Sequence, residues 1–340
     1  MKLKTKLAVV LSGTVALVAA SAVYIVQAQE KNPGRQAADV AIDRDKTVDL
    51  REPGRLVFRN ISAGPDHGKV ASVPLAAPDG PRRVGPLSCD RFYAAADGGL
   101  CLAGVPSPLP SAVALSVDAS LTEKSRVDIA GIPNRAKLSA DGRMASWTTF
   151  VTGDSYSQPG SFSTRTAILD RREDQLSSNI EDIPLLVGEE RHHGEDVNYW
   201  GVTFAADNRT FYATVSTGGR TYLMRGDNQE WRAHTLRENA ECPSLSPDGT
   251  KLAFKKRVSD DDAAPWREHV LDLATMKETP LAETRSVDDQ VVWLDDRTIA
   301  YGLPGENGGP GDIWAVPADG SGAPRLLVAQ ASSPSVTRVS

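Results

Sequence analysis

The segment RHHGEDVNYW carries the best candidate for a metal site, because His192 and His193 adjoin Glu195 and Asp196. Imidazole nitrogens and carboxylate oxygens are the usual protein ligands of zinc and related metals. Successive residues of an extended chain point to opposite sides, however, so two adjacent histidines rarely bind one ion. We therefore expect a solvated polar loop here, and no metal or other cofactor.

Other motifs that would indicate catalysis are missing from the sequence. The run Asp260–Asp262 lacks the residue spacing of a calcium-binding loop. The segment GDSYS at 153–157 lacks the final glycine of a hydrolase nucleophile elbow, and no glycine-rich nucleotide-binding motif is present. We therefore expect that the protein is not an enzyme.

Aromatic side chains that stand beside charged residues indicate a different kind of site. Such side chains are enriched where proteins bind one another. The candidate partner-binding residues are Tyr156, His192, His193, Tyr199, Trp200 and Trp266. They are widely separated along the chain, so only the fold can bring them to one surface.

The elements that would position these residues belong to a repeated unit. Its clearest copy is PSLSPDGTKLAFKKR, Pro243 to Arg257, in which Asp-Gly separates two β-like segments. This dipeptide is the strongest short-range signal of a hairpin, because Gly adopts a positive φ without steric cost. The turns of the related copies fall at Pro53, Asp97, Asp141, Asp207, Asp248 and Asp295.

The spacing of these turns indicates the architecture. The intervals are 41 to 47 residues, apart from one of 66 residues between Asp141 and Asp207. A propeller blade of four short strands takes about 40–50 residues. We therefore predict an all-β protein, a six-bladed β-propeller of four-stranded antiparallel blades over residues 47–330. Within it we expect Trp147, Trp293 and Trp314 to pack in the core.

The order of the four strands in such a blade, called a, b, c and d from the inside outward, predicts which end of the propeller binds a partner. The a–b and c–d turns lie at one end, and the b–c and d–a loops lie at the other. Most long connections fall at the second end: 59–68, 152–164, 188–199, 256–267 and 304–311. A long c–d stretch at 171–183 breaks this pattern. Binding residues concentrate on loops carried by a rigid scaffold, so we expect the long-loop face to bind a partner.

These SPDG-type hairpins resemble the WD-like repeats of the TolB family of β-propellers. Pro243–Phe254 and Lys137–Trp147 carry the resemblance most clearly, and it extends over about residues 47–330. Proteins of that family have an α/β domain before the propeller, for which the 18 residues before Thr47 leave no room. The resemblance implies a scaffold that meets other macromolecules, without naming a pathway.

The N-terminus predicts export. Lys2, Lys4 and Lys6 precede a segment without charge, Leu7–Val26, and small residues follow at Val26-Gln27-Ala28. Residues 1–28 fit either a cleaved signal peptide or a retained membrane anchor. Positive residues stay on the cytoplasmic side, so both interpretations place the rest of the chain outside the cytoplasm. Residues 29–46 read as a linker, and residues 331–340 as a tail or a closing strand.

Two arrangements remain open at the sequence level. The segment 335–340 and the segment Thr47–Leu50 are alternative sources of the strand that closes the ring. Cys89, Cys101 and Cys242 are odd in number, so one thiol has no partner within the chain. Either Cys89 and Cys101 form a disulfide, or all three cysteines are buried thiols.

The net charge excludes some classes of binding partner. The net charge of −6 argues against nucleic acid or an anionic membrane surface as the main partner. We expect a non-enzymatic, monomeric propeller that binds a protein or a component of the cell envelope, with any membrane contact made by residues 1–28. The alternative is a small-molecule or glycan site in the central channel, with or without hydrolase or lyase activity. In that case Asn134, Asn198 and Glu241, at the starts of the inner strands, would face the channel.

Overall fold

The computed structural model describes residues 40–95, 98–151, 163–192, 194, 196–305 and 309–338. The chain divides into two units, Met1–Val40 and Ala41–Ser340, and the second carries every strand described below. The hydrophobic segment 1–28 and most of the predicted linker lie outside the described residues. In the described ranges no helix has the length and apolar character that crossing a bilayer requires.

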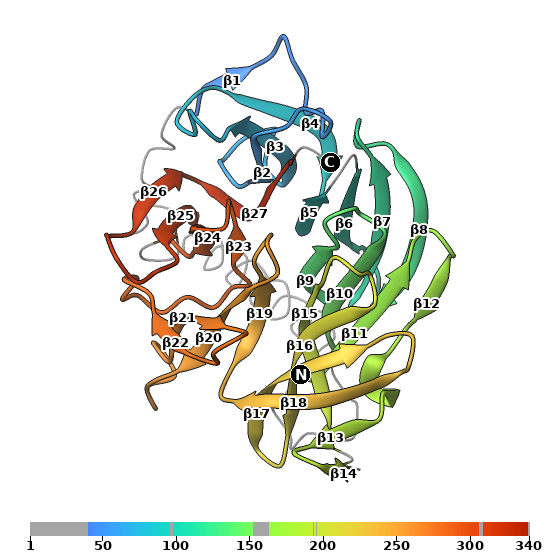
Figure 1. Cartoon of the computed structure of the whole chain (residues 1–340). Helices are drawn as coiled ribbons and strands as arrows, with labels where there is room; N and C mark the ends of the chain where they lie inside the picture. Colours follow the sequence, from blue (N-terminus) through green and yellow to red (C-terminus); the bar gives the residue numbers. More distant parts are fainter. Residues whose placement is uncertain are drawn as a thin grey trace, which may run out of the picture. The chain divides into compact units, whose positions relative to one another are not determined.

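Six β-sheets follow one another around a common axis as the blades of a β-propeller (Figure 1). From the inner to the outer edge, the first three blades are β27 (Ala331–Val336), β2 (Arg55–Asn60), β3 (Lys69–Pro74) and β4 (Arg82–Ser88); β5 (Arg91–Ala95), β6 (Gly98–Val105), β7 (Ser111–Asp118) and β8 (Glu123–Ala130); and β9 (Ile132–Leu138), β10 (Met144–Val151), β11 (Ser163–Asp170) and β12 (Gln175–Ser177). The next three are β15 (Asn198–Phe204), β16 (Thr210–Thr217), β17 (Arg220–Asp227) and β18 (Arg232–Glu238); β19 (Glu241–Leu245), β20 (Lys251–Arg257), β21 (Trp266–Asp272) and β22 (Glu278–Pro280); and β23 (Val292–Trp293), β24 (Thr298–Leu303), β25 (Asp312–Pro317) and β26 (Arg325–Val328). The predicted all-β, six-bladed architecture is confirmed.

The carboxylate of Asp248 explains why the SPDG sequence forms its turn. Asp248 Oδ1 accepts hydrogen bonds from Ser246 Oγ at 2.6 Å and from Thr250 N at 3.0 Å. Gly249 takes the positive φ of 72° that the turn requires. These local bonds satisfy donors that the strand ladder leaves unpaired, so the side-chain hydrogen bonds of Ser246 and Asp248 stay within residues 246–251. The Asp248 amide also donates to Asp296 Oδ1 of the next blade at 3.0 Å.

The hydrophobic core consists of six clusters, each shared by two adjacent blades. Trp147 lies between blades 2 and 3, and Trp293 lies between blades 5 and 6; both are buried, as predicted. Trp314 is half-buried against the same cluster as Trp293, and the Arg285 guanidinium lies 3.9 Å from its ring centroid. Because every blade is packed on both faces, the inner strands form a rigid frame around the axis.

The C-terminal strand closes the ring. β27 pairs antiparallel with β2, from Asn60 opposite Ala331 to Leu56 opposite Val336. The closing strand therefore starts before the 335–340 segment considered from the sequence. The alternative segment, Thr47–Leu50, forms no strand; its Val48 and Leu50 instead pack between blades 1 and 2.

Four further strands lie in segments that we expected to be linker or loop. The end of the predicted linker forms β1 (Ile42–Asp43), which pairs parallel with the free edge of β4. The long c–d stretch at 171–183 instead contains the outer strand β12 and a 3₁₀ turn, η1 (Ile180–Asp182). The hairpin of β13 (Leu185–Val187) and β14 (Glu190–His192) then adds two strands to the outer edge of blade 4. Exposed edges pair readily with any available strand. The 3₁₀ turn and the β13–β14 hairpin account for the longest interval between turns, that from Asp141 to Asp207.

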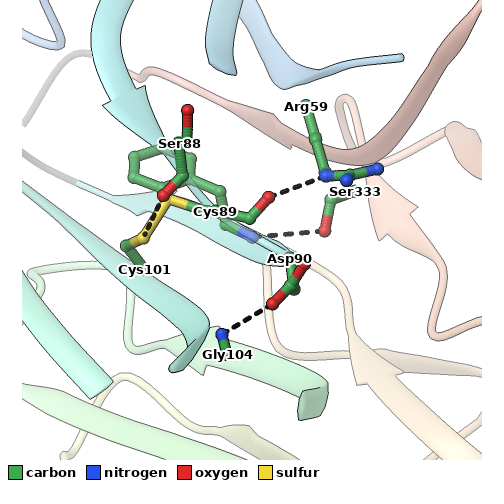
Figure 2. The surroundings of a disulfide bond; sticks show 8 residues. Arg59, Ser88, Cys89, Asp90, Cys101, Gly104 and Ser333 are labelled. Carbon is green, nitrogen blue, oxygen red and sulfur yellow. Dashed lines mark hydrogen bonds between the residues drawn. A yellow bond between two sulfur atoms is a disulfide. The ribbon is translucent and has the colours of Figure 1, made fainter. Parts of the chain in front are cut away.

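A disulfide joins Cys89 and Cys101 next to the ring closure (Figure 2). Their Cα atoms are 5.6 Å apart, and Cys242 remains a free, buried thiol. Arg59 Nε donates to the Cys89 carbonyl at 2.7 Å, and the Phe92 amide donates to Ser333 Oγ of β27 at 3.3 Å. The bridge therefore reinforces the segment that connects blades 1 and 2, against which the closing strand packs.

Replacing both bridged cysteines, as Cys89→Ala with Cys101→Ala, is expected to lower the free energy of unfolding by about 2–3 kcal/mol, because a disulfide restricts the unfolded chain. Urea titration measures this loss. Alkylation of the denatured chain provides the control: we expect one modified cysteine without reductant and three with it. Modification of all three cysteines without reductant would contradict the bridge.

Candidate functional site

A cavity of about 810 Å³ lies at the axis, where the inner strands begin. Its wall is formed by the starts of β5, β9, β15 and β19, so four blades contribute their innermost strand. The lining residues include Arg91, Asn134, Arg135, Asp196, Asn198, Trp200, Glu241, Cys242, Lys255, Trp266 and Asp288. An adjoining hollow of about 640 Å³ shares Arg91 and Asp288 with it. We call the 810 Å³ cavity the channel mouth; it opens at the end of the propeller that carries the b–c and d–a loops.

Three cations lie at the floor of the channel mouth, and two of them, Lys255 and Arg135, are buried. Lys255 Nζ is 2.5 Å from Asp288 Oδ1 and 3.7 Å from Glu241 Oε2. Arg135 Nη2 is 3.7 Å from the same Asp288 oxygen, and Arg91 Nη1 is 3.6 Å from Asp289 Oδ1. Charged groups withdrawn from water need such partners. The floor is therefore a network of opposite charges.

One row of the network comes from the register of blade 5. Glu241 of β19 lies opposite Lys255 of β20, which lies opposite Glu268 of β21. Burial raises the pKa of Glu241, although Lys255 opposes the shift. Burial raises the pKa of Glu268 well above its usual value, and neither carboxyl oxygen has a hydrogen-bond partner among the described residues. The lysine therefore lies between two acids that resist ionisation.

Two aromatic side chains line the same cavity. The Lys255 ammonium lies 4.0 Å from the ring centroid of Trp266, within the range of a cation–π contact. Trp200, from β15, also lines the wall, and both indoles are partly exposed. The channel mouth thus combines fixed charge with flat apolar surface.

The predicted partner-binding residues do not all reach this cavity. Trp200 and Trp266 line it, as do Asn134, Asn198 and Glu241, which we expected at the channel. His192 lies outside it and shares a 2.7 Å hydrogen bond with Thr217 Oγ1, which itself donates to Asp196 at 2.8 Å. Tyr156 and His193 lie outside the described residues.

The placement of Tyr199 on the binding face needs correction. This residue is 0% exposed and belongs to the cluster between blades 3 and 4. Adjacent residues of a strand face opposite sides, so Tyr199 points into the core while Trp200 faces the channel mouth. Its ring therefore has no access to a partner.

The basic residues of the floor were missed in the sequence. Arg91, Arg135 and Lys255 come from three blades, and Asp288 comes from the loop before a fourth. The sequence does contain a signal for some of the charged residues of the floor. Arg91, Arg135 and Glu241 are charged residues in the first half of inner strands, the strands that line the axis of a propeller. Lys255 has no such signal, since it sits near the end of an ordinary second strand.

The chemistry available at the channel mouth is charge recognition. Burial raises the pKa of the Cys242 thiol, which disfavours the nucleophilic thiolate. Within the described ranges, no three His, Cys, Asp or Glu side chains are grouped as metal ligands. The run Asp260–Asp262 lies in an exposed loop, where Arg257 is 2.6 Å from Asp262.

Solved structures with a related fold share little sequence with this chain. TolB from Acinetobacter baumannii superposes with a TM-score of 0.59 at 16% identity, covering 84% of this chain and 67% of TolB. A periplasmic gluconolactonase from Pseudomonas aeruginosa gives a TM-score of 0.48 at 15% identity, covering 84% of this chain and 99% of its own. An oligogalacturonate lyase in complex with manganese gives 0.48 at 10% identity, covering 82% and 89%.

The likeness to TolB establishes the β-propeller fold and no more. No protein-family model matches the chain, and no curated protein sequence matches it.

Proposed function

We propose that this chain is a non-enzymatic binding propeller that takes a protein or a cell-envelope component on its long-loop face, anchored in the channel mouth. The observation that carries the proposal is the pairing of Trp200 and Trp266 with buried charges in one cavity. Partly exposed aromatics beside desolvated charges are typical of the energetic centre of an interface. The surrounding b–c and d–a loops would supply the rim.

We further propose that the protein works outside the cytoplasm. The Cys89–Cys101 disulfide supports this proposal, because such bonds persist in oxidising compartments. The uncharged segment Leu7–Val26 supports it independently from the sequence.

Removing the two indoles, as Trp200→Ser with Trp266→Ser, is expected to weaken partner capture at least 30-fold. Truncating an interface aromatic costs about 2 kcal/mol or more, and 1.4 kcal/mol corresponds to tenfold in affinity. The measurement is affinity capture of the full-length chain from the producing cell's envelope, with the bound proteins quantified by mass spectrometry.

Trp231→Asn is the matched control. Trp231 lies in the c–d turn between β17 and β18, at the opposite end of the blade, with a positive φ of 49° that Asn tolerates better. We expect this variant to retain the partner. Equal recovery with both variants would exclude the channel mouth as the anchor.

A second candidate function is the binding of a free small molecule or glycan, with or without hydrolase or lyase activity. The volume of the channel mouth favours it, because ligand pockets commonly measure about 300–1,000 Å³. If the double tryptophan variant lost saturable binding of small saccharides and captured the same proteins as the parent chain, this candidate would replace the first.

A further inference from the structure

In the two ion pairs that Asp288 forms with Lys255 and Arg135, the cations are buried and the anion is exposed. The Lys255 and Arg135 side chains are only 6% and 8% exposed, whereas the Asp288 side chain between them is 66% exposed. A buried cation normally has a partner that is buried with it. Here the anion belongs to a loop and faces the cavity, so it can leave without disturbing the packed cations.

The other acidic residues near the floor do not balance the charge of its cations. Burial raises the pKa of both Glu241 and Glu268, so these acids neutralise the lysine poorly. Burial acts in the same direction on Asp288, but the Lys255 charge overcomes it and lowers the pKa of that carboxyl. If Asp288 swung away, Lys255 and Arg135 would lose the ion-pair partner that they share, and Asp289 would remain beside Arg91.

Arg135 has donor capacity that the chain leaves unused. Its Nη1 donates to the Asn134 carbonyl at 3.2 Å and its Nη2 to the Asp288 carbonyl at 3.4 Å. Its Nε is buried without a hydrogen-bond partner among the described residues. The Asp288 carboxylate, at 3.7 Å from Nη2, is too far away for a hydrogen bond. A better-placed carboxylate would form the paired bonds that guanidinium groups favour.

We propose that the floor of the channel mouth is a carboxylate-binding site, in which Asp288 occupies the place that a ligand's carboxylate takes. The ligand's acid group displaces Asp288 and binds Lys255 and Arg135, while Trp266 contacts the adjoining part of the ligand. The inference rests on the proposed function and names the chemistry that its partner must carry. The carboxylate comes either from a small free acid or from an acidic polypeptide segment.

Two probes distinguish these sources in calorimetric titrations of the full-length chain at constant ionic strength. Citrate represents a small free acid, and N-acetyl-tetraglutamate amide represents acids carried by a polypeptide. Asp288→Asn removes the tethered competitor, whose effective concentration is of the millimolar order. We expect this variant to bind at least one probe about tenfold or more tightly than the parent chain. The probe that binds more tightly identifies the source.

Lys255→Met provides the opposite variant, because it keeps an apolar stem of similar length and removes the charge. We expect it to weaken binding of the same probe at least tenfold. Arg135→Gln should weaken it too, which covers the case that Lys255→Met fails to fold. Trimethyl citrate, which has no carboxylate, should bind none of the chains.

The site is overturned if Asp288→Asn leaves the affinity for both probes unchanged, or if folded Arg135→Gln binds them as well as the parent does. This failure is distinguishable from failure of the proposed function. If the double tryptophan variant loses partner capture while Asp288→Asn and Lys255→Met keep it, the carboxylate site is refuted. The proposed binding face is then retained.

Discussion

A chain that ends after Gln330 is expected to lose cooperative folding of the propeller. The truncation removes β27, which is the innermost strand of blade 1 and pairs along β2. It also removes Ala331 and Val336 from the cluster between blades 6 and 1, where they are 0% and 5% exposed. The hydrogen bonds of β2 and the packing of two blades then fail together, in a fold whose net stability is expected to be only about 5–15 kcal/mol.

The measurement is thermal unfolding followed by circular dichroism and by tryptophan fluorescence. Ending the chain after Arg338 is the matched control, because it keeps β27 together with the hydrogen bonds that Thr337 and Arg338 make to the first and sixth blades. We expect the control to unfold in one sigmoidal transition, and the shorter chain to give a broad change with no clear midpoint. A sharp transition of the shorter chain within a few degrees of the control would show that the ring does not depend on β27.

Local sequence determines the blades, and this is why they were predictable. In the turn around Asp248, the side-chain hydrogen bonds of Ser246 and Asp248 join residues within five positions of one another, so the pattern can be read directly from the sequence. The alternation of apolar residues on either side then fixes which face of each strand is buried. The ring closure lacks this property. β27 and β2 stand at opposite ends of the chain, and no turn connects them, so nothing near either strand specifies the pairing.

The residues of the channel mouth were only partly predictable, for a related reason. Loop length pointed to the end of the propeller at which the channel mouth opens, and Trp200 and Trp266 line that cavity. Tyr199 was misplaced because it was grouped with its neighbour although strand alternation separates them. The charge network was not predictable, because Glu241, Lys255 and Glu268 belong to three strands and meet only through their register.

The contribution of Glu268 to the stability of the protein is expected to fall as the pH rises above about 4.5. This side chain is 1% exposed, and burial raises its pKa well above the usual 4.5. Above pH 4.5 the unfolded chain has lost this proton while the native chain still holds it, so unfolding releases a proton. Raising the pH therefore favours unfolding until the folded pKa is passed, by up to about 1.4 kcal/mol per pH unit.

Glu268→Gln isolates this effect, because the amide has the same shape and does not titrate. Urea titrations at several pH values give the free energy of unfolding of each chain, and the parent value minus the variant value should decrease as the pH rises above about 4.5. Glu278→Gln, in the neighbouring strand β22, is a control whose difference from the parent should stay constant as the pH rises above about 4.5. Burial tends to raise the pKa of Glu278, but Lys256, His269 and Arg237 overcome this and lower it. That carboxylate therefore stabilises the fold above the unfolded pKa, and its contribution disappears as the pH falls.

The two outcomes bear on the floor of the channel mouth as well as on stability. A difference that decreases with pH for Glu268 means that the acid beside Lys255 is neutral in the folded chain, so the lysine's charge is available to Asp288 or to a ligand. Parallel curves for Glu268→Gln and the parent would mean that Glu268 is ionised and already neutralises Lys255. The floor would then lack the surplus of positive charge that a second carboxylate needs.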